Sequence, residues 1–170
     1  MYANYESIDA RPALRFERRL AHPAAAVWAA ITEPAQLVHW FPTQVSGEMH
    51  GGGHLTFTFQ EHDLPPMQGD VTDFDPPRSL AFWWGEDHLH FELRPAEGGA
   101  QTDLRFTVLL GTEDKAARDG AGWHVCLDGL AATLDGHGEK TVRGVTEGWR
   151  EVYEEYERRG FPATAPIPGT

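Results

Sequence analysis

Apolar and polar residues alternate along the middle of the chain, which is the pattern of half-buried β-strands. Leu55, Phe57 and Phe59, for example, are separated by single threonines. The same alternation predicts six strands: Thr43–Glu48, Leu55–Gln60, Met67–Asp73, Leu80–Trp84, His88–Arg94 and Thr102–Leu110. Short turns join them, so we expect an antiparallel meander. A further strand is predicted at Ala13–Ala21, where Arg18 is the one cation in an apolar row.

A period of 3.6 residues replaces this alternation on either side of the strands. Ala24–Ile31 and Gln36–Trp40 predict two short helices, each preceded by a proline. A long helix is expected from Thr112 to about Leu134 and a last one over Thr146–Arg159. The residues Trp123, Leu127, Leu130 and Leu134 lie on one face of the long helix. Met1–Pro12 reads as a loose polar arm.

This order of elements predicts an α+β fold in which one sheet of six or seven strands curls around the long helix. Both the sheet and the helix have a single apolar face to cover, and each can cover the other. Such a sheet rarely closes completely on one helix, so we expect a cleft at one end. The two short helices would sit at its mouth.

Composition narrows the class of protein. The chain has 170 residues, enough for one domain with a proper core, and a formal net charge of −12. This charge argues against nucleic acid and against anionic membrane surfaces as partners. The N-terminal sequence lacks the apolar region of a secretory signal, and no stretch is long and apolar enough to span a bilayer. We therefore expect a cytoplasmic protein with no membrane insertion.

Several segments together resemble the START-like (SRPBCC) helix-grip superfamily, in the branch named after the C-terminal domain of the activator of the Hsp90 ATPase. They are His22–Thr32, His39–Pro42, Gly51–Phe59, Gly69–Trp84, Thr102–Leu110 and Gly122–Leu134. The resemblance implies a START-like domain over residues 13–135, followed at 136–160 by a helical extension that packs on it. It also implies a hydrophobic cavity between the long helix and the sheet, which in many members holds a small apolar ligand. The family has no universal catalytic residue.

Residues that could carry chemistry are scattered. His88 and His90 share one face of a strand, but they point away from the predicted core, and a zinc site needs further ligands. No serine lies in a nucleophile elbow, and Cys126 reads as a small core or pocket-wall thiol. We expect no metal, no cofactor and no catalytic residue. Arg18, Gln44 and His124 remain candidates for a polar contact near the cleft.

The aromatic residues are the more informative set. A cavity lined by large rings with a few polar groups is how apolar ligand sites are generally made. The predicted ligand-binding residues are Trp28, His39, Trp40, Phe41, Phe57, Phe59, Phe82, Trp84, Phe91, Phe106, Trp123, Leu127 and Leu130. The function predicted is therefore the binding of a small hydrophobic or aromatic molecule.

Two other functions stay open. One is an enzyme of cyclase, dehydratase or hydrolase type on the same fold, which would need a buried histidine or carboxylate facing the cavity. The other is a module that contacts an Hsp90-type chaperone, which would need an exposed docking surface. A homodimer is also possible, because the last helix could pair across a two-fold axis.

Overall fold

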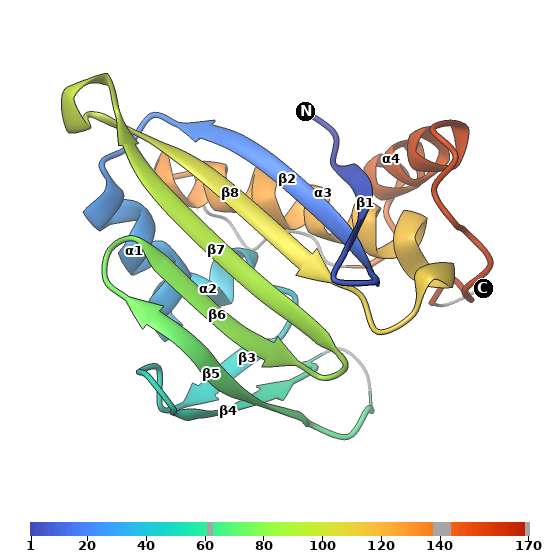
Figure 1. The fold of residues 1–170 in the computed structure, drawn as a ribbon, viewed down its shortest axis with the longest axis horizontal. Coiled ribbons are helices and arrows are strands. Elements are labelled where there is room, and N and C mark those ends of the chain that lie inside the picture. The colour runs from blue at the N-terminus through green and yellow to red at the C-terminus, as the bar shows by residue number, and fades with distance from the viewer. Residues whose placement is uncertain (61–62, 138–143, 169–170) are drawn as a thin grey trace.

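The structure is a computed structural model that describes residues 1–60, 63–137 and 144–168. Its central element is one antiparallel sheet of eight strands in the order β1-β2-β8-β7-β6-β5-β4-β3 (Figure 1). The strands are β1 (Asn4–Ile8), β2 (Arg11–Leu20), β3 (Gln44–Gly47), β4 (His54–Thr58), β5 (Met67–Asp75), β6 (Ser79–Trp84), β7 (Asp87–Ala96) and β8 (Gln101–Leu109). From β3 to β8 each strand pairs with the next, so the predicted meander is confirmed.

The first strand replaces the loose arm that the sequence suggested. β1 pairs with the first half of β2, from Asn4 opposite Arg15 to Ile8 opposite Arg11. Asp9 and Ala10 turn the chain with φ of 48° and 63°, the left-handed conformation that a two-residue hairpin needs. The expectation of an unstructured Met1–Pro12 was wrong, and the sheet gains one strand more than the predicted maximum of seven.

All four α-helices lie against one face of the sheet or beside its edge. They are α1 (Ala24–Thr32), α2 (Pro34–Trp40), α3 (Ala116–Leu134) and α4 (Glu147–Arg158). Figure 1 shows α3 running behind β2 and β8, with α1 and α2 behind β7 and β6. A short 3-10 turn at Glu113–Lys115 precedes α3, so the long helix begins four residues later than Thr112. No helix among the described residues is long and apolar enough to cross a membrane.

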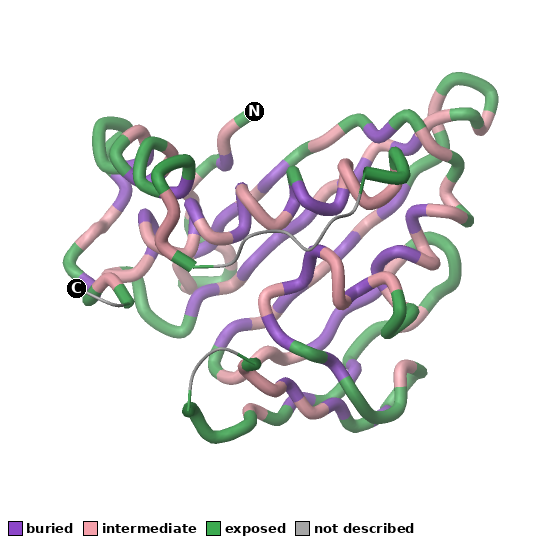
Figure 2. The backbone as a smooth tube through the Cα atoms, turned by 180° about the vertical axis from the view of Figure 1, so that it is seen from behind, coloured by how far each residue is buried: buried purple, intermediate pink, exposed green. Residues whose placement is uncertain are grey.

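The two faces of the sheet differ because alternate residues of a strand point to opposite sides. On β7, Leu89, Phe91 and Leu93 are almost completely buried against the helices, whereas His88 and His90 are only half-buried on the other side. Figure 2 shows the buried residues concentrated where strands and α3 face each other. The outward direction predicted for the two histidines is therefore confirmed.

The N-terminal residues contact α4, which packs on α3. The Ala3 backbone N–H donates a hydrogen bond of 2.9 Å to the hydroxyl of Tyr156, which is fully buried on α4. Thr146 caps the start of α4 by accepting from the Trp149 backbone N–H. The division into a domain at 13–135 and an extension at 136–160 stays a prediction, and residues 138–143 of that extension lie outside the described ranges.

Candidate ligand-binding site

A stack of phenylalanine rings runs across the inner face of the sheet. Its members come from β2, β8, β7, β6 and β4: Phe16, Phe106, Phe91, Phe82 and Phe57. Successive rings lie 5.9, 4.3, 6.2 and 5.7 Å apart between centroids, at interplanar angles of 20–29°. All five side chains are at most 1% exposed. Alternation of apolar residues in each strand therefore produces one continuous aromatic layer.

A glycine lets this layer pass over the strand that contributes no ring. β5 lies between β6 and β4, and its residue Gly69 is next to the point where the rings of Phe57 and Phe82 meet. A Cβ atom at Gly69 would lie 3.3 Å from the Phe57 ring and only 1.7 Å from the Trp83 carbonyl oxygen. Only glycine fits this close approach of two strands.

Phe41, just after α2, joins the helices to the stack. Its ring centroid lies 5.6 Å from that of Trp123 on α3 and 6.2 Å from that of Phe82. Trp40, beside it, contacts Phe91 and donates its indole N–H to the Ala30 carbonyl at 2.9 Å. The rings thus fill the space between α3 and this part of the sheet by contact with one another.

The cluster reaches the surface at the end of β6. Trp84 and Phe59 are half-buried and their centroids are 6.4 Å apart. Trp84 also packs edge-on against Trp123 at 5.3 Å, and its indole N–H donates to the Thr43 hydroxyl at 3.3 Å. Thr43 is fully buried. A buried hydroxyl at an aromatic edge is the kind of polar group that orients a ligand in an apolar site.

The thirteen predicted residues do not all lie together. Nine of them form the connected ring cluster: Trp40, Phe41, Phe57, Phe59, Phe82, Trp84, Phe91, Phe106 and Trp123. Leu127 and Leu130 are buried on α3, and His39 is half-buried on α2. Trp28 packs instead against Phe74, edge-on at 5.4 Å. Their role in binding stays a prediction.

Two polar candidates lie apart from the cluster. Gln44 is exposed on β3, so its side chain is directed to solvent rather than into the interior. Arg18 is half-buried on the inner face of β2, and its guanidinium donates to the Glu17 carbonyl at 3.0 Å. Burial lowers the pKa of this guanidinium, while Asp128 opposes the shift. The sequence analysis placed Thr43 at the start of a strand but missed its contact, because the strand pattern does not show that its hydroxyl meets Trp84, 41 positions away.

Two hollows formed by the described residues lie elsewhere. One, of about 480 Å³, is on the outer face of β2, β8 and β7, and another, of about 200 Å³, lies beside α4. None of the thirteen predicted residues lines either one. Between α3 and the sheet the rings of Phe41, Trp84 and Trp123 contact one another, so a ligand at that place would have to displace a ring.

Two acid–base groups inside the fold, His124 and Tyr156, contact each other. His124 is buried on α3, where its Nδ1 lies 3.2 Å from the Tyr156 hydroxyl and its ring packs on Tyr2. Burial lowers the pKa of His124 and raises the pKa of Tyr156 to about 12. His124 faces Tyr156 on α4, and both groups contact the N-terminal residues. Among the described residues, no group of three histidine, cysteine or acidic side chains could hold a metal ion.

A curved antiparallel sheet that grips one long helix, with two short helices after its second strand, defines the START-like helix-grip class. Within this class the chain belongs to the family described as activator of Hsp90 ATPase homolog 1-like protein, whose sequence pattern matches residues 21–135. This confirms the resemblance seen in the sequence. No curated protein matches the chain.

Solved structures share the fold at low sequence identity. A conserved protein of unknown function from Enterococcus faecalis is 19% identical over 92% of this chain and 89% of its own, with a TM-score of 0.74. CalU16 from Micromonospora echinospora is 23% identical over 92% of each chain, with a TM-score of 0.70. Both likenesses extend beyond residues 21–135, and at these identities they establish the fold alone.

Proposed function

We propose that the protein binds a small hydrophobic or aromatic molecule between α3 and the sheet, at the end marked by Trp84 and Phe59. The observation that carries this proposal is the ring cluster, which comes to the surface at these two half-buried side chains. The family commonly binds hydrophobic ligands, which supports the binding of an apolar molecule.

Binding at this end requires Trp84 to move. Its ring covers Phe41 and Trp123, and its indole N–H occupies the hydroxyl of Thr43. A ligand that replaces the Trp84 ring would stack on Phe41 and Trp123 and could use the Thr43 hydroxyl for one polar contact. Removal of its apolar surface from water would supply about 25 cal/mol per Å².

Titration with the neutral probe N-phenyl-1-naphthylamine tests this proposal through the tryptophan emission of the protein. We expect a saturable change in emission for the wild type. Phe59→Glu should weaken probe binding about 10-fold or more, because a carboxylate would have to be desolvated at the entrance. Thr58→Glu is the matched control, since Thr58 precedes Phe59 and the alternation of the strand directs it to the other face.

Trp84→Ala sharpens the result. If the ligand takes the place of the Trp84 ring, this variant binds the probe more tightly than the wild type, because the space is already vacated. Binding by Trp84→Ala with no saturable change in the wild type would mean that the mutation made the cavity. That outcome, or equal loss of binding in both glutamate variants, contradicts the proposal.

A further inference from the structure

Six charged residues form a checkerboard on the outer face of β2, β8 and β7. Glu17, Arg105 and Glu92 lie in one row across the three strands, since both acids are in register with Arg105. The next row, two residues along each strand, is Arg19, Asp103 and Arg94. The sign of the charge therefore alternates in both directions, about 5 Å apart across strands and about 7 Å apart along them.

Contacts within the sheet use only four of these six charges. Arg19 forms a two-bond ion pair with Asp103, at 2.5 and 2.9 Å, and Arg105 contacts Glu17 at 3.3 Å. Glu92 and Arg94 on β7 form no ion pair with any residue that the structure describes. Cross-strand pairing thus accounts for the columns on β2 and β8 and leaves the β7 column unused.

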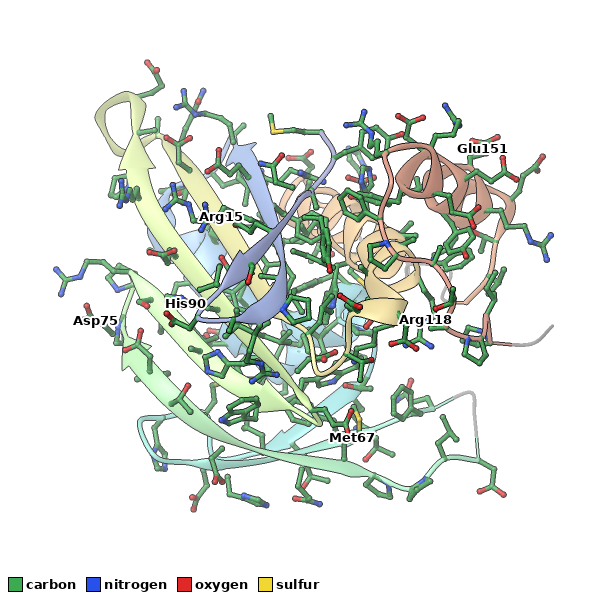
Figure 3. The ribbon with its side chains drawn as sticks, turned by 45° about the vertical axis from the view of Figure 1, so that its right-hand side comes forward. Arg15, Met67, Asp75, His90, Arg118 and Glu151 are labelled. Atoms are coloured by element: carbon green, nitrogen blue, oxygen red, sulfur yellow. The ribbon has the colours of Figure 1, made fainter. Side chains whose placement is uncertain are left out.

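The checkerboard also lies in a depression of the surface. All six side chains line the hollow of about 480 Å³, together with Met1, Arg18 and Leu104. Figure 3 shows the same side of the sheet, where Arg15 of β2 and His90 of β7 extend away from α3. Side chains of a second molecule could therefore enter between the charged ones.

We propose that this face binds a second copy of the same chain across a two-fold axis that lies in the interface, perpendicular to the strands. Such an axis places each row of one copy opposite the other row of its partner. Glu17 then faces Arg19, Arg105 faces Asp103, and Glu92 faces Arg94, each contact occurring twice because a two-fold interface is self-complementary. The two charges without an ion pair are thus brought to each other.

The neighbouring rows allow the same arrangement. Beyond the checkerboard on one side lie Arg15, Thr107 and His90, and on the other side lie Gln101 and Ala96. The two-fold axis sets Thr107 opposite Gln101 and His90 opposite Ala96. Arg15, which pairs with Glu6 in its own chain, is set opposite the end of β2, where no charged residue follows Arg19, so no like charges meet there. The opposite choice of axis, along the strands, would set Glu17 against Glu92 and Arg19 against Arg94.

The charge pattern favours a second copy over other occupants. The six residues sum to zero charge, in a chain whose net charge is −12, so they offer no attraction to a uniformly charged surface such as nucleic acid. A partner gains only if it carries the inverse alternation at the same spacing, which the second copy has by symmetry. Because exposed ion pairs contribute little, we expect a weak dimer with a dissociation constant on the order of 10⁻⁴ M.

Charge reversal on β7 tests the proposal. Glu92→Arg sets two arginines against each other in a homodimer, and Arg94→Glu sets two glutamates against each other. Each variant alone should dimerise at least about 10-fold more weakly than the wild type, because like charges across an interface are repulsive. In an equimolar mixture every contact between the two variants is again between opposite charges, so association should return to near the wild-type level.

Sedimentation velocity from 5 to about 500 µM, at an ionic strength near 0.15 M that screens the repulsion of net charges, measures all four samples. The control pair is Arg150→Glu and Glu154→Arg, the same two changes on exposed positions of α4, whose mixture should associate no better than either variant alone. A monomeric wild type over the whole range, single variants that dimerise like the wild type, or a mixture that stays dissociated would each overturn the proposal. Circular dichroism confirms that each variant is folded.

Discussion

The same three strands present two unlike surfaces, and the contrast separates what holds this protein together from what it can recognise. On the inside, Phe16, Phe106 and Phe91 stack in contact and are essentially inaccessible to solvent. One residue away, the outside carries paired charges whose side chains are about half exposed. Burial makes the inner row the source of stability, whereas exposure leaves the outer row free to meet a partner.

The largest expected effect follows from emptying the inner row. Phe106→Ala removes the ring that contacts Phe16, Phe91 and Trp123. We expect the free energy of unfolding to fall by about 3–5 kcal/mol, from lost transfer energy and from the cavity left behind. Urea denaturation measures this change. A loss below about 1 kcal/mol would mean that the ring stack contributes little to the stability of the fold.

The glycine under the stack should be nearly as sensitive. In Gly69→Ala the new methyl group would meet the Trp83 carbonyl oxygen at 1.7 Å, so β5 and β6 must move apart. We expect a loss of about 2–4 kcal/mol in the free energy of unfolding. Gly122→Ala on α3 is the control, because nothing lies within 4 Å of the added Cβ. There the helix should gain up to about 1 kcal/mol.

Acid should weaken the fold through a buried histidine on the inside and a half-buried one on the outside. Burial lowers the pKa of His124, with Arg18 and the N-terminus adding to the shift and Asp128 opposing it. Burial also lowers the pKa of His88, with smaller effects of His90 and Arg11. The unfolded chain then binds protons more readily than the folded one. The contribution of the two neutral histidines to the free energy of unfolding is therefore fully present above about pH 6.5 and is lost as the pH falls below it.

Unfolding midpoints in urea at pH 8, 7, 6 and 5 check this dependence. His124→Gln should flatten the decline, and His88→Gln, on the outer face, should flatten it less, because that ring is only half-buried, between Trp83 and Thr72. An unchanged slope in His124→Gln would show that its protonation is not linked to folding.

The smallest effect is expected on the outer row. Arg105→Ala removes one ion pair, with Glu17, whose two side chains are 41% and 56% exposed. The free energy of unfolding should change by no more than about 1 kcal/mol, and less at high salt. A loss as large as that of Phe106→Ala would erase the distinction between the two faces.

Much of this contrast could be predicted from the sequence, because a period of two determines which side each residue faces. The six strands of the meander and the outward direction of His88 and His90 follow from it directly. β1 could not be predicted in this way, since Asn4–Ile8 has no apolar row and becomes a strand only by pairing with β2.

Contacts between elements were harder to predict than the elements. Trp28 belongs to an apolar helical stripe, yet it packs on Phe74 rather than in the ring cluster, because the approach of α1 to β5 decides its neighbour. Thr43 and its bond to Trp84 join residues 41 positions apart, and no local pattern announces such a contact. The sequence analysis did not single out the charges of the outer face, because their rows emerge only from the register of three strands.

The bond between Ala3 and Tyr156 links residues 153 positions apart in the sequence. Release of α4 from α3 would remove the acceptor of the Ala3 amide, and peeling of the first strand would leave the Tyr156 hydroxyl without that donor. Both ends should therefore open as one cooperative unit. In hydrogen–deuterium exchange, the Ala3 amide should be protected to the same degree as the interior of the last helix, unlike the rapid exchange of a frayed terminus.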